Sequence, residues 1–290
     1  MRIFDQKELK KLYQPKNNSS KEDNGQITIV GGSSLFHGAP ILALKTASRI
    51  VDMAFFASPE KTLGKTAAIL KSKLSSFIWI PWREVEDYIK KSDAILIGPG
   101  LLRFRSERQK EACEKEGKCG IEGEKTKKTT KKLLGKFPDK KWVIDAGSLQ
   151  TIKPEDLPKG AIITPNKREF KLLFGKNIDD KTEAEKTLLE LSKKYKIYIV
   201  LKGVETLVSS PDEVVVVRGG NAGLTKGGTG DVLAGLTTAL LAKNDPFLSA
   251  CAASYIVKKA ADNLYQKVGF TYNADDLAEE VPKTIKLLLK

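Results

Sequence analysis

The sequence has little cysteine and almost no histidine. Its 290 residues include three cysteines, Cys113, Cys119 and Cys251, and a single histidine. Three cysteines cannot build a disulfide framework, and with one histidine they do not make a Cys/His zinc site. We therefore expect a protein of a reducing compartment, the cytoplasm, that does not depend on either kind of cross-link.

Long hydrophobic segments are also missing. The N-terminal residues, MRIFDQKELKKLYQPK, lack the apolar core of a signal peptide. No uninterrupted apolar run approaches the roughly 20 residues that span a bilayer. The sequence therefore predicts a soluble protein that has no membrane partner.

Negative charge is in deficit. Lys and Arg outnumber Asp and Glu by 50 to 36, which leaves a net charge of +14. Such a surplus can indicate nucleic-acid binding. Half of it, however, comes from residues 103–141, which contain 14 basic and 7 acidic residues. The other lysines are spread over helical patterns in the manner of solvated faces, so nucleic acid is not expected as a partner.

Strand-like and helix-like segments alternate along the chain without a dividing linker. The predicted strands are residues 26–30, 77–80, 94–97, 142–144, 161–163 and 197–201, followed by a hairpin of 207–208 with 214–217. The predicted helices are residues 4–13, 39–53, 167–174, 182–195, 246–267 and 274–289. This alternation favours one mainly parallel, three-layer α/β/α domain over residues 1–290.

Residues 102–140 differ from their surroundings. They are rich in Lys and Glu and poor in large apolar residues. We expect an exposed helical insertion or a partly disordered arm, and a binding role is not favoured.

A glycine-rich stretch, GGNAGLTKGGTGDVLAGLTTALLA at residues 219–242, is the most informative part of the chain. Glycine fills half of its first twelve positions, as expected where the backbone takes positive φ or approaches another group closely. After Asp231 the residues are apolar on nearly all sides, which predicts a buried helix. Gly228, Thr229 and Gly230 thus lie at a helix N-terminus, where free N–H groups and the helix dipole favour an anion.

Asp231 places a carboxylate in that same turn, and two interpretations remain open. Aspartate is a favoured N-cap residue. Alternatively, it is a general base that takes a proton from a hydroxyl attacking a phosphoryl group.

Polar residues also follow several predicted strands. Asp145, Asn166 and Lys202 stand at strand ends, and such ends meet at one edge of a parallel sheet. With Glu169 and Asp231 they supply a cation, carboxylates able to hold Mg²⁺ through water, and an anion-binding helix start, as phosphoryl transfer requires. The alternatives are structural: Asp145 caps the next turn, Lys202 is merely exposed, and Asn166 and Glu169 form a capping box.

A resemblance to a known family rests on motifs in a fixed order. They are GGSSLFHGAPILALKTASRI, AILIGPGLL, VIDAGSL, ITPNKREFKLLFG, VLKGVET and GNAGLTKGGTGDVLAGLTTALLA. From about residue 25 to 282 the chain resembles the ADP- or ATP-dependent NAD(P)H-hydrate dehydratases, which have the ribokinase-like fold. Residues 102–140 are the main gap in the resemblance.

This resemblance implies an activity and assigns roles to residues. The implied reaction is ADP- or ATP-dependent dehydration of the S epimer of hydrated NADH or NADPH through a phosphorylated intermediate, with Mg²⁺. Asp231 would be the catalytic base, and the amides of Gly228, Thr229 and Gly230 would form the anion hole. The positions that match adenine-nucleotide contacts are Lys202, Gly203, Val204, Glu205, Thr206 and Gly230. Those that match substrate contacts are Ala39, Gly100, Asn166 and Asp231.

The chain departs from the family pattern at three places. Asn166 stands where the family usually has His, Leu102 where it has Gly, and Asp145-Ala146-Gly147 where it has DAD. Asn166 to Glu169 also matches the NxxE element of ribokinase-like kinases, so a kinase of a vitamin precursor such as hydroxymethylpyrimidine is an alternative. Those kinases tend to carry Cys at the position of Asp231. A non-catalytic nucleotide-binding protein is a second alternative.

The sequence leaves other properties open. It does not choose between ADP and ATP, and it does not say whether the chain forms a homo-oligomer. The family's frequent fusion partner, an epimerase domain, is not expected, because the lead before residue 25 is too short to contain it.

Overall fold

One sheet of ten strands organises the computed structural model, which describes residues 1–104, 121–178 and 180–289. The strand order is β1-β10-β9-β8-β7-β6-β5-β2-β3-β4. β9 runs antiparallel to both of its neighbours, and every other pair is parallel. The strands are β1 Arg2–Ile3, β2 Gln26–Val30, β3 Met53–Ala57, β4 Ile78–Ile80, β5 Ala94–Ile97, β6 Lys141–Ile144, β7 Ile162–Ile163, β8 Tyr198–Leu201, β9 Thr206–Ser209 and β10 Val214–Val217.

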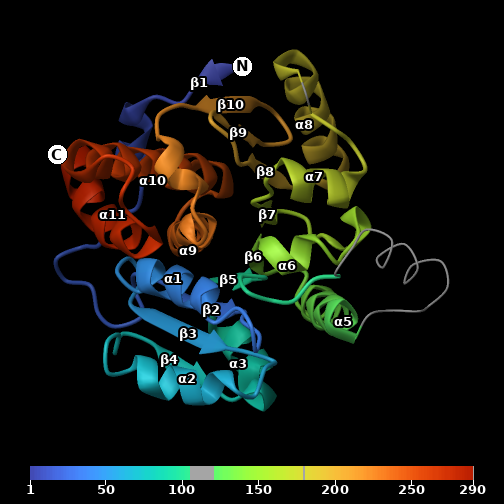
Figure 1. The fold of residues 1–290 in the computed structure, drawn as a ribbon, viewed down its shortest axis with the longest axis vertical. Helices are drawn as coiled ribbons and strands as arrows, with labels where there is room; N and C mark the ends of the chain where they lie inside the picture. The colour runs from blue at the N-terminus through green and yellow to red at the C-terminus, as the bar shows by residue number, and fades with distance from the viewer. Residues whose placement is uncertain (105–120, 179, 290) are drawn as a thin grey trace.

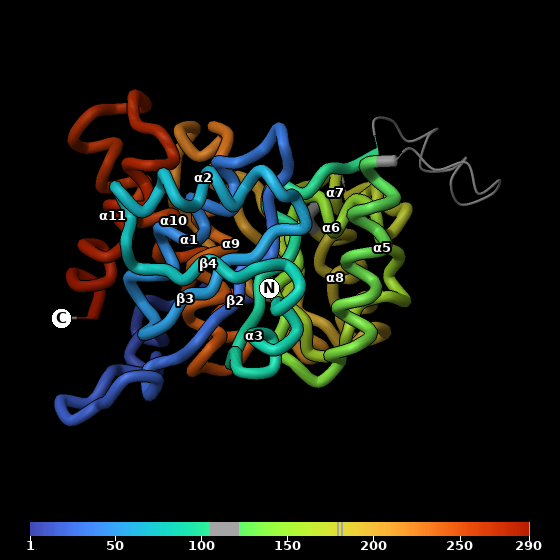
Figure 2. Tube along the Cα trace, turned by 90° about the horizontal axis from the view of Figure 1, so that it is seen from below, coloured from blue at the N-terminus to red at the C-terminus, as the bar shows by residue number. Residues whose placement is uncertain are grey.

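Helices cover both faces of this sheet (Figure 1). On one face lie α1 Gly38–Ala47, α2 Leu63–Leu70, α9 Thr229–Leu241, α10 Pro246–Val268 and α11 Ala274–Leu288. On the other lie α3 Val85–Lys91, α5 Ile121–Lys136, α6 Ala146–Leu149, α7 Lys167–Phe174 and α8 Lys181–Tyr195. Short 3-10 helices are η1 Gln6–Lys11, η2 Trp82–Glu84, η3 Pro154–Asp156 and η4 Ala222–Thr225. Figure 2 shows α5 and α8 on the side opposite α11.

The sheet separates two hydrophobic cores because side chains alternate along each strand. In β5, Leu96 packs with the α9 layer, whereas Ile95 and Ile97 pack with the α5 layer. The prediction of a mainly parallel, three-layer α/β/α fold is confirmed. None of the described helices is both long enough and apolar enough to cross a membrane.

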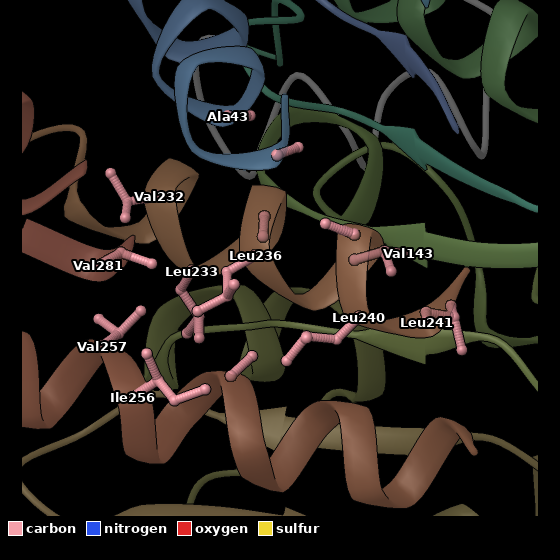
Figure 3. Packing of buried hydrophobic residues seen from close by; sticks show 14 of the residues in the cluster. Ala43, Val143, Val232, Leu233, Leu236, Leu240, Leu241, Ile256, Val257 and Val281 are labelled. Carbon is pink, nitrogen blue, oxygen red and sulfur yellow. The ribbon is translucent and has the colours of Figure 1, made fainter. Parts of the chain in front are cut away.

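Helix α9 lies at the centre of its layer and is buried along almost its whole length. Figure 3 shows Leu233 and Leu236 of α9 close to Ile256 of α10, with Ala43 of α1 on another side. A Cβ atom added at Gly235 would lie 2.4 Å from the carbonyl oxygen of Ala43, so glycine permits the close approach of α1. The predicted buried helix after the glycine loop is confirmed.

Residues 102–140 behave differently from the prediction. Helix α5 belongs to the second helical layer, and Leu133 and Leu134 are each only 1% exposed. The Thr130 hydroxyl shares a buried hydrogen bond of 2.8 Å with Ser148 of α6. The segment is helical as one alternative had it, but an exposed insertion or a partly disordered arm is wrong for α5, because Leu133 and Leu134 lie on a face that packs. Residues 105–120, with Cys113 and Cys119, lie outside the described residues, and the single-domain assignment stays a prediction.

Two other predicted elements are corrected by the structure. The helix predicted over residues 39–53 ends at Ala47, and Met53–Ala57 is β3, a strand inside the sheet. The connecting residues, SRIVD, contain no Gly or Pro, so the pattern carries no signal for the change from helix to strand. The helix predicted over residues 4–13 is the 3-10 helix η1.

Candidate active site

Three of the predicted site residues follow adjacent parallel strands. Asp145 follows β6, Asn166 follows the short β7, and Lys202 follows β8. Asn166 and Lys202 also form an isolated parallel bridge that extends the ladder past the strand ends. The helix start at Thr229 reaches the same edge, because a Cβ atom added at Gly230 would lie 3.4 Å from Lys202 Nζ. The predicted convergence of these residues is thus observed.

The ammonium group of Lys202 is held between two carboxylates. Its Nζ lies 3.0 Å from Asp145 Oδ1 and 3.7 Å from Glu169 Oε2. Burial works to lower the pKa of Lys202, but the charges of Asp145 and Glu169 outweigh it and raise that pKa. Lys202 therefore stays cationic. Its side chain is only 21% exposed, so the alternative that Lys202 is merely an exposed lysine is wrong.

The Asp145 carboxylate pairs with Lys202 and does not cap a helix. It precedes α6 but makes no side-chain capping hydrogen bond. Its Oδ1 accepts hydrogen bonds from Lys202 and from the Thr164 hydroxyl, the latter at 2.7 Å. The capping alternative for Asp145 is wrong.

Asn166 and Glu169 do form the predicted capping box at the start of α7. Each backbone N–H donates to the other side chain at 2.9 Å. Gln150 Nε2 donates to the remaining oxygen, Glu169 Oε1, at 3.1 Å. Burial raises the pKa of Glu169, and the nearby Lys202 opposes this effect. Both carboxylate oxygens thus already have protein partners.

Asp231 lies in the first turn of α9 without being its cap. The N-cap is Gly228, with φ 95°, and the helix runs from Thr229. Burial raises the pKa of Asp231 to about 7, the negative charge of Asp145 adds to the effect, and Lys202 opposes it. A carboxyl group with such a pKa is well matched to accept a proton near neutral pH. Of the two interpretations of Asp231, the capping one is wrong.

The turn that precedes α9 is shaped by tertiary contacts. A Cβ atom at Gly228 would lie 2.5 Å from Leu42 and 2.8 Å from Ala274. The Thr229 hydroxyl donates to the carbonyls of Leu224 and Lys226, so this side chain holds the loop. Among the described residues the N–H groups of Gly228 and Gly230 donate to no protein acceptor. These two amides are therefore available to an anion, whereas the third predicted amide, that of Thr229, donates to the Lys226 carbonyl at 3.4 Å.

A cavity of about 500 Å³ opens beside this helix start. The predicted nucleotide residues that line it are Lys202, Gly203, Val204, Thr206 and Gly230, and Asn166 lines it too. Glu205 instead borders a smaller neighbouring cavity. Apolar side chains of Leu224, Leu233 and Val257 complete the wall, which suits a flat heterocycle. These three residues were not predicted from the sequence, because their pattern is that of ordinary core positions.

Of the other predicted substrate residues, Asp231 is not among the lining residues of that cavity, and Ala39 and Gly100 lie outside the lining as well, close to each other. Ala39 is in the first turn of α1, and Gly100 follows β5 with φ 71°. A Cβ atom at Gly100 would lie 2.5 Å from the Phe36 carbonyl oxygen and 3.0 Å from Pro40. Glycine is therefore needed where this turn meets α1. Within the described residues, no group of three or more His, Cys, Asp or Glu side chains could hold a metal ion.

Comparison with known proteins identifies relatives in archaea. The chain is 34% identical to a bifunctional NAD(P)H-hydrate repair enzyme Nnr of Methanocaldococcus jannaschii, over 97% of this chain and 52% of that protein. It is 31% identical to an ADP-dependent (S)-NAD(P)H-hydrate dehydratase of Nitrosopumilus maritimus, over 93% of this chain and 92% of the other. The chain spans about half the length of several bifunctional relatives that it matches.

Solved structures share the fold. A ribokinase-like superfamily protein of Enterococcus faecalis aligns with a TM-score of 0.79 at 21% identity, over 99% of this chain and 96% of that one. The ADP/ATP-dependent NAD(P)H-hydrate dehydratase of Bacillus subtilis, co-crystallized with ATP/Mg²⁺, aligns with a TM-score of 0.75 at 22% identity, over 99% and 98%. The ribokinase-like fold is thereby confirmed. Because the family model for NAD(P)H-hydrate dehydratase also matches residues 27–283, the chain belongs to the NAD(P)H-hydrate dehydratase family.

Proposed function

We propose that this protein dehydrates the S epimer of hydrated NADH or NADPH back to NADH or NADPH, with ADP or ATP as phosphoryl donor. The observation that carries the proposal is Asp231, a buried carboxyl whose pKa is raised to about 7, set in the helix turn whose free amides suit a phosphate. Membership of the family and the name of the Nitrosopumilus relative support it. A cytoplasmic location is part of the proposal.

In the first step a phosphoryl group is transferred to the hydroxyl on ring carbon 6. Hydroxide is a poor leaving group, and phosphorylation turns it into a good one. Asp231 takes the hydroxyl proton, the oxygen attacks the terminal phosphorus, and the bond from phosphorus to AMP or ADP breaks. The amides of Gly228 and Gly230, with Lys202, would stabilise the charge that spreads over the phosphoryl oxygens.

In the second step the ring recovers its double bond. The lone pair of the ring nitrogen helps to expel phosphate from carbon 6, and a proton leaves carbon 5. The pair of electrons from that C–H bond forms the bond between carbons 5 and 6. The products are the dihydronicotinamide, free phosphate and the shortened nucleotide.

The adenine nucleotide fits the cavity beside α9. Its base would pack between the apolar side chains of Leu224, Leu233 and Val257. Its phosphates would then point toward Lys202 and the N-terminus of α9, where charge and dipole favour them.

A magnesium ion would supply charge neutralisation for the phosphates. The described residues contain no group of three or more His, Cys, Asp or Glu side chains that could hold the ion. Mg²⁺ does not need such a group, because it is commonly bound by phosphates, water and one or two carboxylates. Both oxygens of Glu169 accept hydrogen bonds, but each keeps a second lone pair. A contact through water is the role that this geometry leaves to Glu169.

Product analysis tests the proposal. The purified protein is incubated with hydrated NADH and either ADP or ATP, and the near-ultraviolet absorbance and free phosphate are followed together. We expect one phosphate for each NADH regenerated. A phosphorylated product that accumulates without NADH would identify a kinase. Absence of turnover, with salt-dependent binding of nucleic acid, would identify a non-catalytic protein.

A further inference from the structure

Helix α10 carries a lysine that is almost completely buried. Lys258 is only 4% exposed, and its Nζ donates to three backbone carbonyls. The distances are 2.7 Å to the oxygen of Val204, 3.0 Å to that of Gly219 and 3.3 Å to that of Gly203. All three donor positions of the ammonium group are therefore used on the main chain.

These carbonyls belong to two separate loops that both border the 500 Å³ cavity. Gly203 and Val204 form the turn between β8 and β9, and Gly219 begins the glycine loop after β10. The three residues and Lys258 all line that cavity. One side chain thus joins two loops that border the cavity to α10.

The other side chains of the turn between β8 and β9 lie toward the surface. Gly203 has no side chain, and the side chain of Val204 projects into solvent with 95% exposure. Glu205 is tied to Arg218 by an exposed ion pair of 2.8 Å. Lys258 is a buried attachment of this turn.

The charge of Lys258 is not balanced by an ion pair among the described residues. Among the described residues no carboxylate lies within ion-pair distance of its Nζ, and Asp262 pairs with the neighbouring Lys259 at 3.8 Å. Burial lowers the pKa of Lys258, and the charges of Asp262 and Glu205 oppose only part of this effect. Burying a cation without a carboxylate is costly, so its hydrogen bonds to the loops must offset that cost.

We propose that Lys258 is a positioning residue for the adenine nucleotide: it holds the β8–β9 turn and the glycine loop at the separation that the nucleotide needs. The identity of the ligand rests on the proposed function. Lys258 acts through the main chain of the loops and takes no part in the chemistry.

The test compares Lys258→Met with Lys259→Met. Methionine keeps most of the length of the side chain but has no donor and no charge, and Lys259 is a partly exposed neighbour on the same helix. We expect the Kd for ADP, measured by titration calorimetry, to rise at least about tenfold in the first variant and to stay unchanged in the second. In the dehydration assay the nucleotide KM should rise more than kcat falls.

A chemical rescue separates positioning from general loss of structure. In Lys258→Ala the missing atoms correspond to propylammonium, which should restore part of the ADP affinity, whereas 1-propanol of similar size should restore less. Thermal melting establishes that each variant is folded. If Lys258→Met does not fold, Lys258→Gln replaces it, because the amide keeps two N–H donors, and its ADP affinity should still fall severalfold.

The possible failures can be told apart. Wild-type protein that binds neither ADP nor ATP would overturn the proposed function and this inference with it. Wild-type protein that binds ADP, together with a folded Met or Gln variant that binds it equally well, would overturn the inference alone.

Discussion

Asp231, in the first turn of α9, and Lys202, after β8, lie near each other, but burial dominates the pKa of the first and neighbouring carboxylates dominate that of the second. Burial shifts the pKa of the Asp231 carboxyl up to about 7, so that it can exchange a proton near neutral pH. The carboxylates of Asp145 and Glu169 outweigh burial at Lys202 and keep it cationic. A proton acceptor and a fixed positive charge beside free amides are the combination that phosphoryl transfer to a hydroxyl requires.

Removing the carboxylate tests the proposed base. We expect Asp231→Asn to bind adenine nucleotide nearly as well as wild type and to turn over at least roughly 10²–10⁴-fold more slowly, the usual effect of losing a general base. Calorimetry with ADP and the dehydration assay measure the two properties. Normal turnover by the variant would exclude Asp231 as the base.

The raised pKa of Asp231 also predicts how stability depends on pH. Between its ordinary value of 3.8 and about 7 the unfolded chain has lost this proton while the folded protein keeps it. The contribution of Asp231 to the free energy of unfolding therefore falls as pH rises through this window. We expect the melting temperature of Asp231→Asn, relative to wild type, to increase from pH 4 to pH 7. A difference that does not change with pH would contradict the raised pKa.

We expect Asn166 to orient the phosphoryl group or the substrate and to take no part in proton transfer. Its Oδ1 accepts the Glu169 N–H in the capping box, and Asn has no proton to exchange near neutral pH. Asn166→His should therefore leave the rate within about tenfold and introduce no inflection near the imidazole pKa of about 6.5. The rate on hydrated NADH is measured against pH for both forms. A gain above about tenfold, or roughly 1.4 kcal/mol of barrier, would assign the position a role in proton transfer.

At the scale of elements, α9 depends on close packing and α5 on a single apolar face. Gly235 lets α1 approach α9 so closely that a Cβ atom would meet the backbone of Ala43. In α5, Leu133 and Leu134 are buried against the sheet although half of the residues of the helix are charged. Both helices help to position site residues. Helix α9 contains Asp231, and α5 packs on α6, which follows Asp145.

The contact at Gly235 predicts a cost for the smallest side chain. An added Cβ atom would lie 2.4 Å from Ala43 O and 2.7 Å from Ala43 Cα, and backbone atoms cannot move aside easily. We expect Gly235→Ala to lower the free energy of unfolding by about 1–3 kcal/mol. Gly135→Ala in α5 is the control, because its Cβ atom meets nothing within 4 Å, and it should stabilise by up to about 1 kcal/mol. Urea unfolding compares them, and equal stabilities would refute the packing argument.

Burial of α5 predicts that the segment cannot be removed as a whole. Leu133→Ala should cost about 2–5 kcal/mol in urea unfolding, the usual effect of truncating a buried leucine. Lys128→Ala, on the exposed side of the same helix, is the control and should change stability by less than about 0.5 kcal/mol. If the leucine variant were as stable as the lysine variant, α5 would be the dispensable arm that its composition suggests.

At the scale of the whole molecule, the fold could be predicted where local signals were strong. β5, α7 and β10 have the predicted bounds, because apolar runs there end at Gly, Asn or charged residues. The helix predicted over residues 39–53 took in Met53, and the rest of β3 was not predicted, because no turn signal precedes the strand. The meeting of Asp145, Asn166 and Lys202 could also be predicted. Each follows a strand of a parallel sheet, and in this fold class the carboxyl ends of such strands lie at one edge.

The sequence by itself determined features whose partners lie within a few residues. The Asn166–Glu169 box, for example, closes over three residues. Only the tertiary structure decided the features that need distant segments. Lys202 reaches Asp145 across 57 positions, and Lys258 reaches Gly219 across 39. The raised pKa of Asp231 and the burial of α5 are also features of this second kind. Both depend on how many atoms pack around a side chain, and a local sequence pattern contains only its near neighbours in the chain.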